Sequence, residues 1–238
     1  MEMIDPLDLL PPPRSSTPSP RKGDQLFCND RLEGSTAHIH IDKVGHVAAY
    51  IQGYHRGAEC LVQHVLEKDG GDENVLIYPI VFLYRHHIEL ALKRILLRCP
   101  EMLGRQLTPD EEKHLADHRL DNLWSDLKPL IGPIYDAMLW REPEAADLEG
   151  INSYIRQLSD ADPQSYSFRY SRKKKRNEAS LPKTLTHINI RHFAEMMERL
   201  ISYIDDIDTA TSLYEEYCDE ANAEYAYDCA VLRGDHDY

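Results

Sequence analysis

Apolar residues recur at three- and four-residue spacing along five stretches of the chain, as they do in helices that bury one face. The predicted helices cover about residues 44–65, 74–99, 109–131, 144–159 and 189–207, the last continuing in a looser form to about residue 229. SYSFRYS, residues 165–171, alternates as a short strand does. The sequence shows no run of strands and no alternation of strands with helices. We therefore predict an all-α fold, an antiparallel bundle of four to five helices with an irregular basic loop or short hairpin before the last long helix.

Glycine, proline and asparagine mark the ends of these helices. DGGDEN at residues 69–74 ends the first helix, and Pro100 and the pair Gly132-Pro133 are predicted to end the second and the third. Asn189 is suited to cap the N-terminus of the last helix, because its side chain accepts a backbone hydrogen bond.

The two ends of the chain differ in composition from the middle. Residues 1–36 hold six prolines between Pro6 and Pro20. Proline has no amide donor and a fixed φ, so it favours an extended arm over a helix or a sheet. The sequence predicts a disordered Pro-rich arm at 1–36, a helical domain at 37–207, and an acidic tail at 208–238 that is helical in part.

Charged and polar residues interrupt the most apolar stretch, YPIVFLYRHHIELALKR, residues 78–94. Arg85 and Glu89 are four residues apart and fall on one face of a helix, with His86 and His87 on or beside its apolar side. A buried charge is costly unless it is paired. Two interpretations stay open: an Arg85–Glu89 ion pair at the edge of a bundle, or a polar cleft between helices that serves binding or catalysis.

The third predicted helix carries a second polar cluster, HLADHRLD, residues 114–121. If this helix packs antiparallel to the second, His118 comes close to Arg85, His86 or His87. Two helices that both present histidine and charged residues strengthen the cleft interpretation. The predicted catalytic residues are Arg85, His86, His87, Glu89 and His118.

A basic segment lies before the last helix. FRYSRKKKR, residues 168–176, holds six cationic and two aromatic side chains, a combination that suits phosphate contacts and base stacking. The predicted nucleic-acid-binding residues are Arg169, Tyr170, Arg172, Lys173, Lys174, Lys175 and Arg176. The alternative is that this loop pairs with the acidic tail, since residues 205–238 hold eleven Asp or Glu against one Arg.

The overall composition limits what the chain binds. The net charge of −14 argues against a protein whose whole surface binds nucleic acid, although it permits a local basic site. The five scattered cysteines favour a reduced cytoplasmic compartment, and nothing in the sequence predicts a membrane helix or a signal peptide. HIHIDKVGH, residues 38–46, offers metal ligands, but no second ligand cluster follows, so we expect no metal and no cofactor.

Three segments resemble those of HEPN-like proteins, a broad group of bacterial helical proteins. The matching residues are Pro79, Phe82, Leu83, Arg85, His86, Glu89, Leu90, Leu92 and Lys93 in the first, His118, Leu120 and Leu123 in the second, and Asp162, Pro163, Ser165, Phe168, Arg169 and Tyr170 in the third. The similarity covers about residues 44–204. It implies an antiparallel four-helix core in a protein that is usually dimeric and belongs to a defence or toxin-type system.

The resemblance implies one of two functions. Many HEPN-like proteins are metal-independent ribonucleases with an R-x4–6-H motif, in which arginine holds a phosphate and histidine assists the attack of a 2′-hydroxyl. In this chain the motif occurs only from Arg31 to His38, ahead of the predicted helices, so a site would be assembled across helices from Arg85, His87 and His118. Other members are non-catalytic modules that recruit nucleic acid or a partner protein, such as one from the same defence operon. A ribonuclease predicts a cleft open to solvent, and a binding module predicts that Arg85 and His118 are buried in saturated hydrogen bonds.

Overall fold

The structure is a computed structural model of the chain. It describes residues 20–24, 26–27, 36–37, 43–67, 71–141, 143–173 and 178–233. Residue contacts divide the chain into two units, residues 1–42 and residues 43–238. The described part of the first unit includes a turn in which the Asp24 carboxylate accepts a hydrogen bond from the backbone N–H of Arg21. The boundaries of the Pro-rich arm and the acidic tail stay predictions.

The first two helices follow the predicted pattern. α1 spans Lys43–Glu67 and α2 spans Glu73–Met102. α2 continues past Pro100, the residue predicted to end it. Gly104 follows the helix end instead, with a φ of +64°, and this left-handed residue lets the N–H of Arg105 reach the Pro100 carbonyl at 2.8 Å.

The third predicted helix is divided into shorter pieces. They are α3 (Pro109–Ala116), α4 (Leu120–Leu127), the 3-10 turn η2 (Lys128–Leu130) and α5 (Ile131–Ala137). The prediction of one helix is wrong because the chain turns between α3 and α4, where the Asp117 carboxylate accepts the N–H of His118 at 2.7 Å. The His118 carbonyl accepts from Arg85. The prediction that Gly132-Pro133 ends a helix is wrong. Pro133 lies in the first turn of α5, where backbone N–H groups have no partner within the helix, so the missing N–H of proline costs no hydrogen bond.

The remaining helices are α6, Ala145–Ala161, and α7, Ile190–Arg233. Asn189 caps α7 as predicted, because its side-chain oxygen accepts the N–H of His192 at 3.0 Å. The strand predicted at 165–171 is wrong: the segment is a helical turn, in which the Tyr166 carbonyl accepts the N–H of Tyr170 at 3.1 Å. Local hydrogen bonds therefore override the alternating pattern. A single antiparallel bridge follows, between Arg172 and Ala179.

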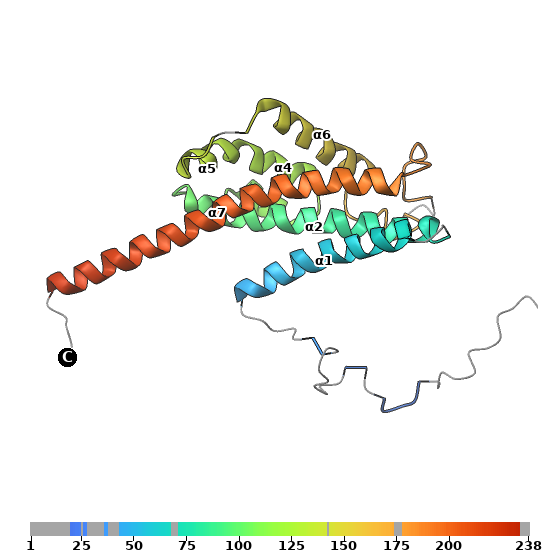
Figure 1. The fold of residues 1–238 in the computed structure, drawn as a ribbon, viewed down its shortest axis with the longest axis horizontal. Helices are drawn as coiled ribbons and strands as arrows, with labels where there is room; N and C mark the ends of the chain where they lie inside the picture. The colour runs from blue at the N-terminus through green and yellow to red at the C-terminus, as the bar shows by residue number, and fades with distance from the viewer. Residues whose placement is uncertain are drawn as a thin grey trace, which may run out of the picture. The chain divides into compact units, whose positions relative to one another are not determined.

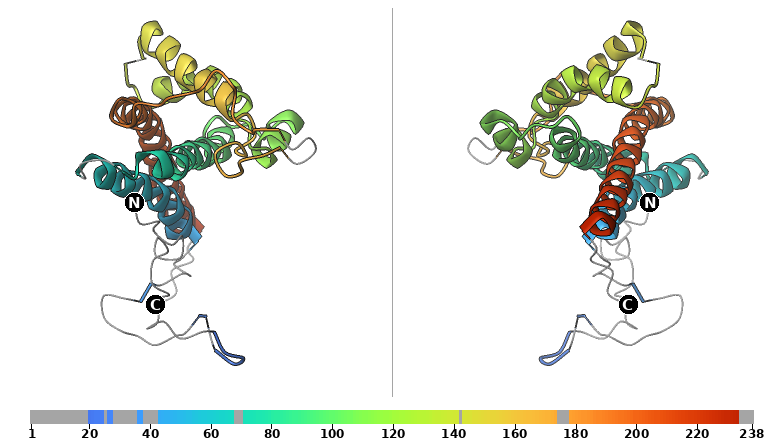
Figure 2. Two further views of the ribbon diagram at one scale, coloured as in Figure 1. Left: turned by 90° about the vertical axis from the view of Figure 1, so that its right-hand side faces the viewer. Right: turned by 90° about the vertical axis from the view of Figure 1, so that its left-hand side faces the viewer.

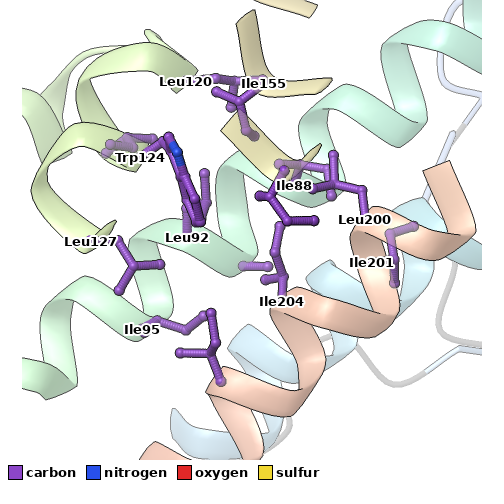
Figure 3. Close-up of a cluster of buried hydrophobic side chains, with 14 of the residues drawn as sticks. Ile88, Leu92, Ile95, Leu120, Trp124, Leu127, Ile155, Leu200, Ile201 and Ile204 are labelled. Atoms are coloured by element: carbon purple, nitrogen blue, oxygen red, sulfur yellow. The ribbon is translucent and has the colours of Figure 1, made fainter. Parts of the chain in front are cut away.

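α2 is the central helix of the second unit and contacts α1, α4 and α7. α1 lies on one side of α2 and α7, and α4, α5 and α6 lie on the other (Figures 1 and 2). Figure 3 shows the core where four helices meet, with Ile88, Leu92, Trp124, Ile155 and Leu200 in one cluster. The prediction of an all-α helical bundle is confirmed, and the structure describes no strand.

The apolar character of α2 is explained by this central position. By length and composition alone, Glu73–Pro100 could cross a membrane, and it is the one such helix in the described part of the chain. Half of its most apolar window is buried inside the protein. Packing against three other helices therefore accounts for the apolar residues that the sequence concentrates there.

α7 is packed along only part of its length. Its buried residues extend from Ile190 to Thr211. Beyond Thr211 none of its described side chains is buried, although Ser212 and Glu215 still contact Arg98 of α2. The C-terminal part of the helix extends away from the other helices (Figure 1). The helix therefore has a packed part and a projecting part.

Candidate functional site

Arg85 on α2 is the centre of a hydrogen-bonded network that joins α2, the turn before α4 and the end of α6. Its side chain is 0% exposed. Nε donates to the Asp162 carbonyl at 3.1 Å, Nη1 to Glu89 Oε2 at 3.1 Å, and Nη2 to the His118 carbonyl at 2.7 Å. The Asp162 carboxylate lies 3.7 Å from Nε. Each nitrogen of Arg85 thus donates at least one hydrogen bond within the protein, and the buried side chain is closed to a phosphate from solvent.

Glu89, one turn after Arg85, is the shared acceptor of this network. Its side chain is 1% exposed, and its Oε1 accepts from Lys93 Nζ at 3.0 Å and from His118 Nδ1 at 2.7 Å. Burial acts to raise the pKa of Glu89, but contacts with His86, His118 and Lys93 outweigh burial and hold the pKa well below its usual range. The network therefore keeps an ionised carboxylate in an almost dry position.

His118 is the member of the network that faces solvent, with 55% of its side chain exposed. A carboxylate only accepts hydrogen bonds, so Nδ1 of His118 carries the proton that is donated to Glu89. In the neutral ring, Nε2 then carries the free lone pair. Glu89 thus fixes the tautomer and the orientation of an exposed imidazole, which is the arrangement that proton transfer needs.

His86 lies at the edge of the network and is held mainly by aromatic contacts. Its ring meets Tyr54 edge-on at 4.4 Å and stacks on Phe82 at 5.6 Å between centroids. Its Nδ1 is 3.9 Å from Glu89 Oε2, which is too long for a hydrogen bond. His86 therefore shapes the surroundings of Glu89 without joining its hydrogen bonds.

His87 lies apart from the other predicted catalytic residues. It faces α1, where its Nδ1 is 2.9 Å from the Ile51 carbonyl and its ring centroid is 5.0 Å from that of His55. A two-residue step along a helix turns a side chain by roughly 200°, so His87 and Arg85 point to different sides of α2. The structure brings Arg85, Glu89 and His118 together, but the predicted grouping of Arg85 with His87 and His118 is wrong.

Asp162 connects this network to the loop that follows α6. Its Oδ1 accepts the backbone N–H groups of Tyr166 and Ser167 at 2.7 and 2.8 Å. These bonds start the helical turn that stacks Tyr166 on Tyr170, with ring centroids 4.6 Å apart. The Arg169 guanidinium lies 5.7 Å from the Tyr170 ring centroid. The turn thus presents an aromatic and cationic surface, on which Tyr170 is half exposed.

A cavity of about 430 Å³ lies beside this turn. Its lining includes Arg119, Asp162, Gln164, Tyr166, Ser167 and Lys173. Arg119 directly follows His118 in the sequence, and its guanidinium is paired with Asp121 at 2.6 Å. The cavity therefore combines two cationic side chains with polar groups, and one of the cations follows the exposed histidine in the sequence.

The predicted basic residues have different positions. Arg169 donates from Nε to the Ser165 carbonyl, so it is committed in part to the loop itself. Arg172 and Lys173 are exposed. The other predicted members, Lys174, Lys175 and Arg176, lie outside the described residues, and so do Arg31 and His38.

Sequence reasoning did not assign Asp162, Arg119 or Gln164 to a site. The only signal for Asp162 was its place in the DPxSxxFRY segment, where its role as an Arg85 partner could not be read. Arg119 could have been found from its position directly after His118. Gln164 carries no sequence signal, because it reaches the cavity only through the fold of the loop.

No family model, no curated protein and no solved structure matches this chain.

Proposed function

We propose that this chain is a HEPN-like protein of a prokaryotic defence or toxin-type system, which cleaves RNA without a metal ion in the cytoplasm and acts as a homodimer. The observation that supports this proposal best is the exposed imidazole of His118, held at 2.7 Å by the buried carboxylate of Glu89. The HEPN-like resemblance supplies the defence setting and the dimer.

The chemistry assigned to His118 is proton transfer. Its Nε2 takes the proton of a ribose 2′-hydroxyl as that oxygen attacks the adjacent phosphorus, and Glu89 stabilises the imidazolium that forms. The bond from phosphorus to the 5′-oxygen then breaks, and the leaving oxygen receives a proton from His118 or from water. The products are a 2′,3′-cyclic phosphate and a 5′-hydroxyl, so no redox partner or metal ion is needed.

Phosphate binding is assigned to side chains other than Arg85. Arg119 and Lys173 line the cavity next to His118 and carry the positive charge that a phosphodiester needs. Tyr170, half exposed and stacked on Tyr166, offers an aromatic face to a base of single-stranded RNA. Arg85 acts indirectly, because its bond to the His118 carbonyl holds the turn that carries the imidazole.

The experiment is cleavage of total RNA and transfer RNA by the purified full chain in the presence of EDTA. His118→Ala is compared with His114→Ala, a matched control: His114 Nδ1 lies 2.7 Å from Asp126, a second histidine–carboxylate pair. We expect His118→Ala to lower the cleavage rate by at least ~100-fold, the usual contribution of a general acid–base group, and His114→Ala to leave it unchanged.

Two outcomes would contradict the ribonuclease proposal. One is intact RNA after incubation with wild-type protein that is folded by circular dichroism. The other is equal cleavage by the two histidine variants, which would assign the activity to another group or to a contaminant.

A second function is favoured by the complete burial of Arg85. A phosphate-binding arginine needs N–H groups that solvent reaches, and the Arg85 side chain is 0% exposed. This favours a non-catalytic helical module that binds RNA or a partner protein through its loop and its ends. Such a module would bind RNA without cleaving it, and Tyr170→Ala and Lys173→Ala would weaken that binding while His118→Ala would not.

A further inference from the structure

A second polar cluster lies between α1 and α7, away from the His118 network. His55 and Glu59 are one turn apart on α1, and Glu198 comes from α7. α1 and α7 contact each other and run side by side in Figure 1. One ligand atom from each of the three residues lies within 4.8 Å of the other two. The fold thus joins an imidazole and two carboxylates that the sequence separates widely.

The distances in this cluster suit a shared metal ion. His55 Nε2 lies 3.0 Å from Glu198 Oε2 and 3.9 Å from Glu59 Oε1. Ligand atoms at about 2.1 Å from a tetrahedral zinc ion are roughly 3.4 Å apart. The two measured separations lie on either side of that value, so small side-chain rotations would bring the atoms into a coordination sphere.

The hydrogen-bonding capacity of the cluster is unbalanced in favour of acceptors. Both oxygens of Glu198 lie 3.0 Å from one atom, His55 Nε2, which has at most a single proton to donate. Glu59 lies within ion-pair distance of the same nitrogen. Two carboxylates therefore lie around one imidazole nitrogen, and a divalent cation would bind the lone pairs that protein donors leave over.

The surroundings supply the support that metal ligands usually have. The Tyr84 hydroxyl donates to Glu198 Oε1 at 2.9 Å. This hydrogen bond orients the Glu198 carboxylate, as an outer partner of a metal ligand does.

His87 adds an independent observation beside the cluster. It is 2% exposed, its ring centroid is 5.0 Å from that of His55, and its Nε2 is buried without a hydrogen-bond partner. The Ile51 carbonyl only accepts, so Nδ1 of His87 carries the proton and Nε2 carries a bare lone pair. A buried polar nitrogen without a partner is costly in a protein that binds nothing there.

We propose that His55, Glu59 and Glu198 bind one divalent transition-metal ion, with zinc as the best-fitting probe, and that the ion joins α1 to α7. Nitrogen and carboxylate ligands without thiolate suit Zn²⁺ or Mn²⁺, and zinc binds such sites more tightly. Three protein ligands leave a fourth position for water or an added ligand. The ion lies on the α1 side of α2 and takes no part in the chemistry proposed for His118.

The test is a zinc titration of the full chain after treatment with a chelator, in competition with a chromophoric zinc indicator, together with thermal unfolding. We expect one Zn²⁺ per chain and a Tm that rises with zinc concentration. Glu198→Gln and Glu59→Gln should each weaken zinc binding at least ~100-fold. Tyr84→Phe should weaken it by about 10-fold, as loss of an outer partner does. Glu59 is half exposed, so its variant folds even if Glu198→Gln does not.

Two controls separate this site from adventitious binding. His64→Ala removes a similar exposed pair near the C-terminal end of α1, in which His64 lies 3.0 Å from Asp72. The double variant His38→Ala/His40→Ala removes two of the three histidines of the HIHIDKVGH segment. Neither should change the zinc affinity or the Tm shift. Absence of zinc binding, zinc binding that survives Glu59→Gln and Glu198→Gln, or binding lost in the His38/His40 variant would each overturn the proposal.

Discussion

Two polar clusters lie on different sides of α2, and they differ in the burial of their carboxylates. On the side toward α4 and α6, the Glu89 carboxylate is 1% exposed, and both of its oxygens accept hydrogen bonds from the protein. On the side toward α1 and α7, the carboxylates of Glu59 and Glu198 are about half exposed and lie within ion-pair distance of one nitrogen, His55 Nε2.

This difference separates two uses of polar side chains. The hydrogen bonds of the buried Arg85 cluster hold the turn and the ring of His118, so this cluster fixes the position of the imidazole. The half-exposed carboxylates around His55 Nε2 are open to a positive charge from solvent. The first cluster is therefore a scaffold for an exposed group, and the second is a binding site.

The largest loss of stability is expected from breaking the hydrogen-bonded network around Arg85. Arg85→Met removes the guanidinium that Glu89 and the carbonyls of Asp162 and His118 share, so we expect a loss of about 3–5 kcal/mol in the free energy of unfolding, measured by urea denaturation. Arg85→Met combined with Glu89→Leu should cost less than the sum of the single variants, because no unpaired charge stays buried. Arg141→Met, in an exposed pair with Glu144, is the control and should change stability by less than ~1 kcal/mol. Equal losses at Arg85 and Arg141 would contradict the assignment of a scaffold.

A smaller loss of stability is expected when the Glu89 carboxylate is replaced by a neutral group, and this loss should depend on pH. The folded-state pKa of Glu89 lies below its unfolded value of about 4.3. Its stabilising contribution is therefore fully present above about pH 4.3 and is lost as pH falls through the folded pKa. Glu89→Gln should lower stability by about 2–3 kcal/mol at pH 7, and the difference from wild type should narrow below about pH 4. A difference that stays constant from pH 7 to pH 3 would show that the charge of Glu89 contributes nothing.

The smallest loss of stability is expected at His87, beside the cluster between α1 and α7. His87→Leu removes one hydrogen bond, to the Ile51 carbonyl, but also removes a buried nitrogen that has no partner. These two changes oppose each other, so we expect a loss of less than ~1.5 kcal/mol, measured by urea denaturation of metal-free protein. A loss as large as that of Arg85→Met would mean that the two clusters do not differ in the way described.

The sequence predicted what depends on local periodicity. α1, α2, α6 and α7 follow from the spacing of apolar residues, and the Arg85–Glu89 pair follows from their four-residue separation. The break between α3 and α4 could not be predicted, because it is stabilised by contacts of the turn at His118 with Arg85, 33 residues away. The helical spacing of apolar residues from 120 to 131 predicted one continuous helix and gave no sign of this turn.

The candidate sites depend even more on contacts between distant segments. His55 and Glu198 are 143 residues apart, and only the packing of α1 against α7 brings them together. His55 and Glu59, at a four-residue spacing on one helix face, were the only local signal for the proposed metal site. The place of Asp162 beside Arg85 likewise needed the fold of the loop after α6.

The division of α7 at Thr211 has a consequence for how this helix exchanges its amide hydrogens with water. The backbone is one helix of 44 residues, yet only the part before that point is covered by core side chains. Amides in the covered part exchange when the core opens, while those in the projecting part exchange when the helix frays from its C-terminal end, because most of the stability of a helix in a protein comes from packing. One continuous helix therefore contains two segments that differ in the free energy of opening.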